Sequence, residues 1–380
     1  MRKAVFVLVL FLISINILAL EFDTRLAKSA QSSIIRLISD IQLGQVALFG
    51  QESPQSQVLI HEGDIVVNGS QKLTIKNCEF VQYGKIMIAD NSTLEIENAT
   101  LYIKNPQNYF RYGLIVTNQS SLLLANATLI LAHGKKPKEL EQTVLIERNS
   151  TASILDSRIT SPFKNAWVVS RYNSKISVQN SSFDNSTGLG IFDGSTGYIQ
   201  DSTLTYQLNT ARNSKLIVED SYVNSVHGGE ACDIQIKNCV IYSYSRIYWE
   251  STLLVYNSSI LSIFEVYGAT AKFNNSSIEE LVVNDYGSAR LVRCSVSKTR
   301  GLNNSTVWLI NSDGGAISTI NESEVFVGYD LPLFGVVLFP YTWIPILQAL
   351  MITLTITIVI IVILILKRRF RRHPSTPAFH

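Results

Sequence analysis

Two aspartates beside glycines are the residues whose types and spacing could act on a polysaccharide. Asp184 and Asp193 lie in one short stretch, SFDNSTGLGIFDG. Hydrolysis of a glycosidic bond uses two carboxyl groups about 5 to 9.5 Å apart, one of which protonates the leaving oxygen. Aspartate beside glycine is also an ordinary turn residue. We therefore expect turn aspartates here and keep the catalytic pair as the alternative.

A histidine and a glutamate around two glycines form the second candidate, for acid–base or metal chemistry. The segment reads His227-Gly-Gly-Glu230. One histidine and one glutamate are too few ligands for a metal site, and the segment is typical of a turn. A lyase would need calcium-binding carboxylates around a base such as Arg171, Arg212 or Arg246, and the sequence places no acidic cluster there. We predict no metal and no cofactor.

The densest group of aromatic residues runs from Tyr242 to Tyr256 and includes Tyr244, Tyr248 and Trp249. An aromatic face on the flank of a protein can stack against the apolar face of a sugar ring. Alternation along the chain indicates that some of these rings belong to the core. Tyr242, Tyr244, Tyr248 and Trp249 are therefore the candidates for glycan binding.

A repeat of strand character must position all of these residues. The recurring pattern is N-S-x-φ-x-φ-x-N-S-x-φ, in which φ is apolar. Copies are NSTLEIENATL from Asn91, NSKISVQNSSF from Asn173, GSTGYIQDSTL from Gly194, NSKLIVEDSYV from Asn213, ESTLLVYNSSI from Glu250 and GATAKFNNSSI from Gly268. Alternation within each copy indicates strands, and short stacked strand repeats indicate a solenoid. The leucine-rich-repeat pattern and the hexapeptide period of left-handed β-helices are absent. We predict an all-β, right-handed parallel β-helix of about twelve coils spaced by about 4.8 Å.

The second polar position of the repeat forms a column along the rod. Its members are Asn77, Asn98, Asn126, Asp156, Asn180, Asp201, Asp220, Asn238, Asn257, Asn275, Arg293 and Asn311. Asn and Asp tolerate a left-handed bend, and strict alternation from the preceding strand points them inward. We therefore expect a buried column whose amides bond one another from coil to coil. The four cysteines fall on columns otherwise held by Ala or Ser, so we expect small buried residues rather than disulfides.

Asn-x-Ser/Thr sequons are frequent between the two ends of the chain, as on a glycosylated exterior. If the column points inward, its sequon members Asn98, Asn126, Asn180, Asn257 and Asn275 cannot easily carry a sugar. The expected glycosylation sites are the outward ones, Asn68, Asn91, Asn118, Asn149, Asn185, Asn304 and Asn321.

Both ends of the chain are apolar. Residues 1–20 read as a signal peptide, with an uncleaved signal anchor as the alternative, and a helical stripe from Arg25 to Ile41 indicates a cap. Residues 344–366 carry no charge and are long enough to cross a bilayer; aromatics precede them and the basic run from Lys367 follows, which puts the tail in the cytoplasm. The expected organisation is 1–20 signal peptide, 21–59 N-terminal cap, 60–330 β-helix ectodomain, 331–343 membrane-proximal segment, 344–366 transmembrane helix and 367–380 cytoplasmic tail.

The repeats resemble the pectate-lyase-like right-handed β-helix superfamily, and especially β-helix cell-surface proteins of archaea, over roughly 60–327. The chain is also similar to the carbohydrate-binding and sugar-hydrolase repeat, whose style the stretch NSTGLGIFDGSTGYIQDS matches best. The resemblance implies a fold and leaves function open, because members include polysaccharide lyases, glycoside hydrolases and envelope proteins. The formal net charge of +2 gives no reason to expect a nucleic-acid partner. We expect a single-pass cell-membrane protein with a structural, adhesive or glycan-binding role, whose partners are the membrane and polysaccharide or envelope proteins; an anchored lyase or hydrolase is the alternative.

Overall fold

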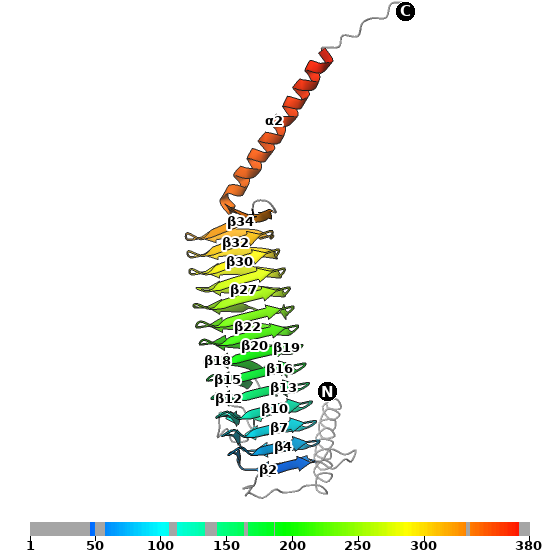
Figure 1. The fold of residues 1–380 in the computed structure, drawn as a ribbon, viewed down its shortest axis with the longest axis vertical. Coiled ribbons are helices and arrows are strands. Elements are labelled where there is room, and N and C mark those ends of the chain that lie inside the picture. The colour runs from blue at the N-terminus through cyan, green and yellow to red at the C-terminus, as the bar shows by residue number, and fades with distance from the viewer. Residues whose placement is uncertain are drawn as a thin grey trace, which may run out of the picture.

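The chain forms a long rod of stacked strands with one helix at its C-terminal end (Figure 1). The computed structural model describes residues 46–49, 58–105, 112–133, 143–162, 166–185, 187–331 and 335–371. The rod is an all-β parallel solenoid of right-handed type with about 13 turns, which confirms the predicted fold class. The signal peptide, the cap helix and most of the basic tail lie outside the described residues.

Each turn contributes one strand to a 15-stranded sheet, here sheet 1. Its neighbouring strands are parallel except for the last pair. In order they are β1 (Val46–Phe49), β4 (Lys72–Lys76), β7 (Thr93–Glu97), β10 (Ser121–Ala125), β13 (Thr151–Leu155), β16 (Lys175–Gln179), β19 (Thr196–Gln200), β21 (Lys215–Glu219), β23 (Asp233–Lys237), β26 (Thr252–Tyr256), β28 (Thr270–Asn274), β30 (Ser288–Val292), β32 (Thr306–Ile310), β34 (Glu324–Leu331) and β35 (Gly335–Pro340).

The rest of each turn belongs to a 20-stranded sheet, here sheet 2, which folds in the middle so that many turns contribute two strands. These strands are β2 (Val58–Glu62), β3 (Ile65–Val67), β5 (Glu79–Tyr83), β6 (Ile86–Ile88), β8 (Thr100–Asn105), β9 (Tyr112–Val116), β11 (Thr128–His133), β12 (Thr143–Glu147), β14 (Arg158–Thr160), β15 (Ala166–Arg171), β17 (Ser182–Asp184), β18 (Thr187–Phe192), β20 (Thr203–Ala211), β22 (Tyr222–Gly229), β24 (Val240–Ile241), β25 (Ser245–Tyr248), β27 (Ser259–Tyr267), β29 (Ser277–Asn284), β31 (Ser295–Leu302) and β33 (Ala316–Ile320). Residues 106–111 and 134–142, which connect strands of sheet 2 along the chain, lie outside the described residues.

Alternation within the strands builds the core. In β7, Leu94 and Ile96 are fully buried while Glu95 and Glu97 face out. Parallel register places Leu94 beside Leu122 of the next turn, so like residues stack along the rod. The result is one continuous apolar column between the two sheets.

Two bends close every turn. The first bend, from sheet 1 to sheet 2, holds one residue in the left-handed region; its twelve members are the polar column named above, with φ between 46° and 55°. The second bend, from sheet 2 back to sheet 1, usually holds two such residues, as at Arg212–Asn213 and Trp249–Glu250. Asn and Asp suit these positions because their short polar side chains lower the cost of a left-handed backbone.

The predicted inward direction of the first-bend column is wrong. Asn77, Asn98, Asn257 and the other members are exposed. A left-handed residue interrupts the alternation, so two consecutive side chains face outward and the next one turns in. The predicted bonding between neighbouring amides is confirmed on the outside, for example from Asn126 Nδ2 to Asn98 Oδ1 at 2.7 Å.

The residue after each first-bend residue forms the buried column instead. Ser157, Ser181 and Ser202 are buried there, and each serine Oγ accepts a hydrogen bond from the backbone N–H one turn earlier. Cysteine replaces serine in this column at Cys239. All four cysteines are buried and free, as expected, and burial raises the pKa of the Cys239 thiol to about 11.

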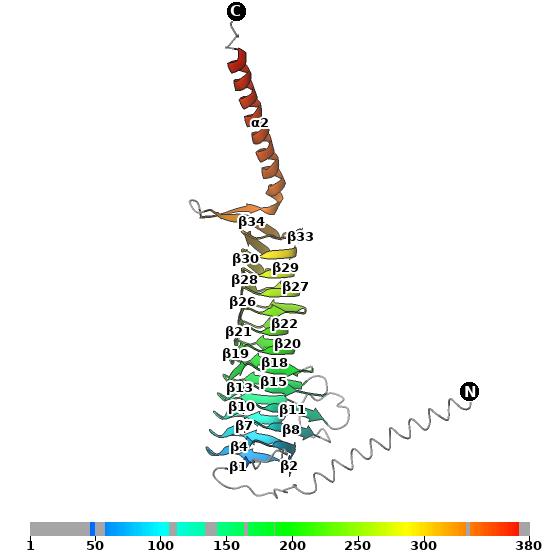
Figure 2. The ribbon, with the colours of Figure 1, turned by 90° about the vertical axis from the view of Figure 1, so that its right-hand side faces the viewer.

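Among the described residues, a cover at the C-terminal end of the rod lies on the side of sheet 1. β35 pairs antiparallel with β34 and closes sheet 1, followed by a short 3-10 helix (Tyr341–Trp343) and by α2 (Ile344–Arg371). Figure 2 shows this hairpin and α2 continuing beyond the last turn. The last strand of sheet 2, β33, is largely exposed.

α2 begins at the residue where the transmembrane segment was expected to begin. Among the residues that the structure describes, no helix is both long enough and apolar enough to qualify as a membrane span. The transmembrane segment at 344–366 is therefore not confirmed and is taken up below as a proposal.

Candidate functional site

Asp184 ends β17 and Asp193 directly follows β18, so the whole of β18 lies between the two candidate catalytic aspartates. That strand has six residues, so it alone separates them by about 20 Å at the usual rise per residue, far more than a glycosidase pair allows. Each carboxylate is held by an arginine: Asp184 by Arg158 at 2.5 Å and Asp193 by Arg212 at 3.2 Å. The structure does not bring them together.

His227 and Glu230 also point to different partners. His227 lies on the outer face of β22, with its ring 6.3 Å from that of Tyr244. Burial, followed by the charge of Arg246, lowers the pKa of His227. Glu230 is a second-bend residue that accepts a hydrogen bond from Arg212 Nε at 3.1 Å. Among the described residues no group of three or more His, Cys, Asp or Glu side chains could hold a metal ion.

The predicted aromatic platform divides into separate groups. Tyr242 stacks on Tyr222 of the preceding turn, near the first bend, with ring centroids 6.3 Å apart. Tyr244 lies farther along the turn, where its hydroxyl bonds Glu265. Burial and then Glu265 raise the pKa of Tyr244. Tyr248 and Trp249 are at the second bend, so the four residues do not share one surface.

Trp249 is the most accessible part of the last group. Its side chain is 55% exposed, and its ring meets that of Tyr248 edge to face, with centroids 4.7 Å apart. The Tyr248 ring lies against Gly229 of the preceding turn, where a Cβ would come within 2.5 Å of the ring. Arg246 covers Tyr248 at 5.3 Å. This packing fixes Tyr248, and Tyr248 in turn supports Trp249.

A groove of about 550 Å³ runs beside Trp249. We call it the Trp249 groove; its lining residues are Arg212, Asn213, Glu230, Ala231, Trp249, Glu250 and Gly268. The residues beside Trp249 on the two neighbouring turns, Ala231 and Gly268, are small and make room for its ring. Backbone bonds hold these turns together: the Ala231 N–H donates to Trp249 O, and the Glu250 N–H donates to Gly268 O. The groove therefore combines one open aromatic face with charged side chains.

Arg212 organises the charges of this groove. It bridges Asp193 on one turn and Glu230 on the other, and these two carboxylates raise the pKa of the guanidinium. Together with Glu250 the local charge is negative. The arrangement can stack a sugar ring on Trp249 and accept hydrogen bonds from its hydroxyls, and it is unfavourable for a polyanion.

The sequence prediction included Trp249 but missed the Arg212 bridge. Asp193, Arg212, Glu230 and Trp249 follow one another at intervals of 18 to 19 residues. That interval is the length of the local turns. This regular interval is the signal in the sequence that places the four residues in one row along the rod.

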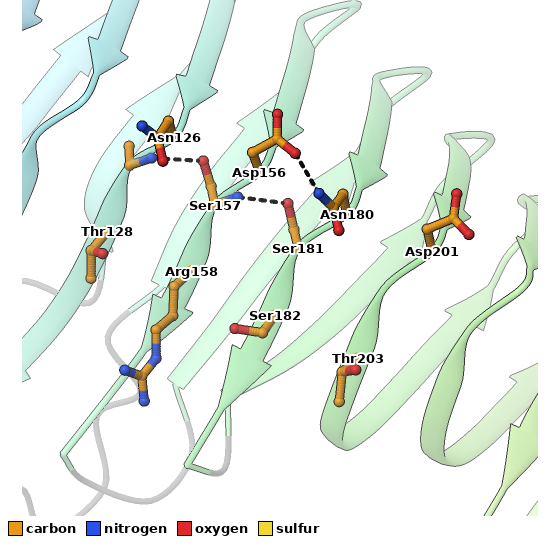
Figure 3. Close-up of a pocket in the computed structure, with 11 residues that line it drawn as sticks. Asn126, Thr128, Asp156, Ser157, Arg158, Asn180, Ser181, Ser182, Asp201 and Thr203 are labelled. Carbon is orange, nitrogen blue, oxygen red and sulfur yellow. Dashed lines mark hydrogen bonds between the residues drawn. The ribbon is translucent and has the colours of Figure 1, made fainter.

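The sequon asparagines expected to face outward are exposed or half-buried, and those expected to face inward are exposed too. A second groove of about 370 Å³ follows the first bend, with Asn126, Asp156, Asn180 and Asp201 along it. Figure 3 shows these four side chains in a row on successive turns. Its lining is almost entirely polar and contains no aromatic ring.

No family model matches the chain, and neither a curated protein nor a solved structure does. The parallel β-helix part of the resemblance is confirmed by the fold. Membership of the pectate-lyase-like superfamily remains a proposal.

Proposed function

We propose that this chain is a membrane-anchored extracellular rod of the pectate-lyase-like β-helix type that binds glycan at the cell envelope without cleaving it. The observation that carries the proposal is the Trp249 groove, in which an open ring adjoins polar groups that can bond sugar hydroxyls. Because Glu230 and Glu250 outnumber the single Arg212 at this groove, the favoured ligand is a neutral or amino-sugar glycan rather than an acidic one.

The anchor rests on the sequence of 344–366 and on exposed apolar side chains at the same end of the rod. Met351, Ile356 and Leu364 of α2 are half exposed or more, which is costly in water and favourable in lipid. The last turn also exposes Tyr329, and Trp343 precedes the helix. Aromatic residues at this position are typical of the headgroup layer.

The anchor is tested by adding protease to intact cells that carry an epitope at the C-terminus. We expect the solenoid to be digested and the tail beyond α2 to survive. If the solenoid survives on intact cells but is digested in permeabilised cells, the extracellular placement is contradicted.

The binding role is tested with the purified full chain in detergent against neutral, amino-sugar and acidic polysaccharides. We expect weak retention of the first two classes and no release of reducing or unsaturated sugar, with or without calcium. Sugar release that disappears in both Asp184→Asn and Asp193→Asn would establish the hydrolase instead, and preferential binding of acidic polymers would contradict the proposed ligand.

A further inference from the structure

The first bend exposes asparagines that the sequence had led us to bury. Asn98, Asn126, Asn180, Asn257 and Asn275 are all exposed, and each begins an Asn-x-Ser/Thr sequon. We propose that these five asparagines form a second row of N-glycosylation sites, along the edge opposite the Trp249 groove. The inference rests on the extracellular placement proposed above.

The hydroxyl groups that complete the five sequons are accessible in the folded chain. The sequon hydroxyls are Thr100, Thr128, Ser182, Ser259 and Ser277, which open the sheet 2 strands and are half-buried or exposed. The co-reactant is a sugar activated at C1 by a phosphate leaving group. The Asn Nδ2 attacks C1, the new N–C bond forms as the C–O bond to phosphate breaks, and Nδ2 gives up one proton.

The bonding between neighbouring side chains is compatible with this substitution. Asn126 Nδ2 donates to Asn98 Oδ1, and Asn257 Nδ2 donates to Asn238 Oδ1 at 3.4 Å. A substituted side-chain amide keeps one N–H, directed opposite to its C=O as in a trans peptide. This remaining N–H can keep the bond between turns, while the sugar takes the other position on Nδ2.

Spacing along the rod limits how many sites are filled together. Asn98 and Asn126 lie on adjacent turns, as do Asn257 and Asn275, so each pair is separated by about 4.8 Å. This is close to the width of one pyranose ring, so a sugar on one member crowds its neighbour. Asn180 lies between Asp156 and Asp201, so neither neighbouring turn carries a sequon asparagine in this row, and its Nδ2 donates to Asp156 Oδ1 at 2.5 Å (Figure 3). We expect Asn180 to be the most fully occupied and each pair to carry one sugar per molecule.

The test is site-by-site mass spectrometry of the full chain purified from the membranes of cells that produce it. A matched variant, Ser259→Ala, removes the sequon of Asn257 and leaves its amide in place. We expect Asn180 to be occupied and Asn275 occupancy to rise about twofold in Ser259→Ala. Sugar at Asn149 and Asn304 of the second bend but at none of the five would overturn this inference and leave the extracellular placement intact. Sugar at no asparagine at all would overturn the inference as well, and the protease experiment would then decide the placement separately.

Discussion

The two bends of each turn use the same left-handed backbone but different side chains. At the first bend, nearly every turn has Asn or Asp, and Arg293 is the exception among its twelve members. At the second bend, the same φ values are adopted by Tyr172, Arg212, Glu230 and Trp249. The first bend is thus uniform and the second varied, although both face solvent.

This difference indicates that the first-bend side chains mainly stabilise the stack of turns, whereas the second-bend side chains can provide specificity for a ligand. Amides at the first bend bond one another across turns, and the serines behind them bond the backbone. Both interactions require the same residue types on successive turns. The second bend is backed by buried serines of the same kind, as where the Ser120 N–H donates to Ser150 Oγ and the Ser150 N–H donates to Ser174 Oγ. Its exposed left-handed positions nevertheless hold residues of many types, as the Trp249 groove requires.

The largest effect is expected behind the first bend. Ser202 Oγ accepts from the Ser181 N–H at 3.1 Å and donates to Gln200 O at 2.6 Å. Ser202→Val leaves that N–H unpaired and adds volume to a packed column, which should cost about 2 to 4 kcal/mol of stability. Thermal unfolding measures the loss. Ser202→Cys is the control and should cost far less, because Cys239 occupies the same position in its own turn; equal losses would show that the hydroxyl bonds contribute little.

A smaller effect is expected at the bend residues themselves. Asn257→Leu places a side chain poorly suited to φ near 48° and removes the bond to Asn238, so it should cost about 1 to 2 kcal/mol. Tyr172→Leu at the second bend, φ 56°, should change stability by less than about 0.5 kcal/mol, because an unfavourable residue is already there. Equal shifts in unfolding temperature would erase the distinction between the bends.

The smallest effect concerns the strand between the bends. Burial lowers the pKa of His227 from its ordinary 6.5, so the unfolded chain binds that proton more readily than the folded one. Stability should be full above pH 6.5 and fall as the pH drops below it. His227→Gln should flatten this dependence when unfolding is followed between pH 7.5 and 5. An unchanged slope would show that other groups cause it.

The sequence alone predicted the strands of each turn correctly, but it misplaced the side chains at the first bend. Leu94 and Ile96 alternate as strand residues do, and the same alternation, continued to Asn98, points it inward. The left-handed φ of 48° at Asn98 ends the alternation, and nothing in the spacing alone distinguishes a bend that reverses a side chain from one that does not. Cys239 was placed correctly because its column is otherwise held by Ala or Ser, an expectation that does not depend on the alternation.

The candidate site was predictable only in part, for a related reason. Trp249 was identifiable as an aromatic residue in a dense group, but its separation from Tyr242 depends on the fold within sheet 2. Asp184 and Asp193 looked close because they are near in sequence, and an intervening extended strand keeps them apart. Proximity across turns, as between Asp193 and Arg212, follows from the register of the stack rather than from local sequence.

The most direct measurement compares glycan binding by two aromatic variants of the full chain. Trp249→Ala removes the open ring of the second-bend groove, while Tyr222→Ala removes a similarly exposed ring near the first bend. Losing one stacking contact of about 1 kcal/mol should weaken binding about fivefold in Trp249→Ala, with Tyr222→Ala unchanged and both variants unfolding at closely similar temperatures. Equal affinities for the two variants, or a loss confined to Tyr222→Ala, would contradict the assignment of recognition to the second bend.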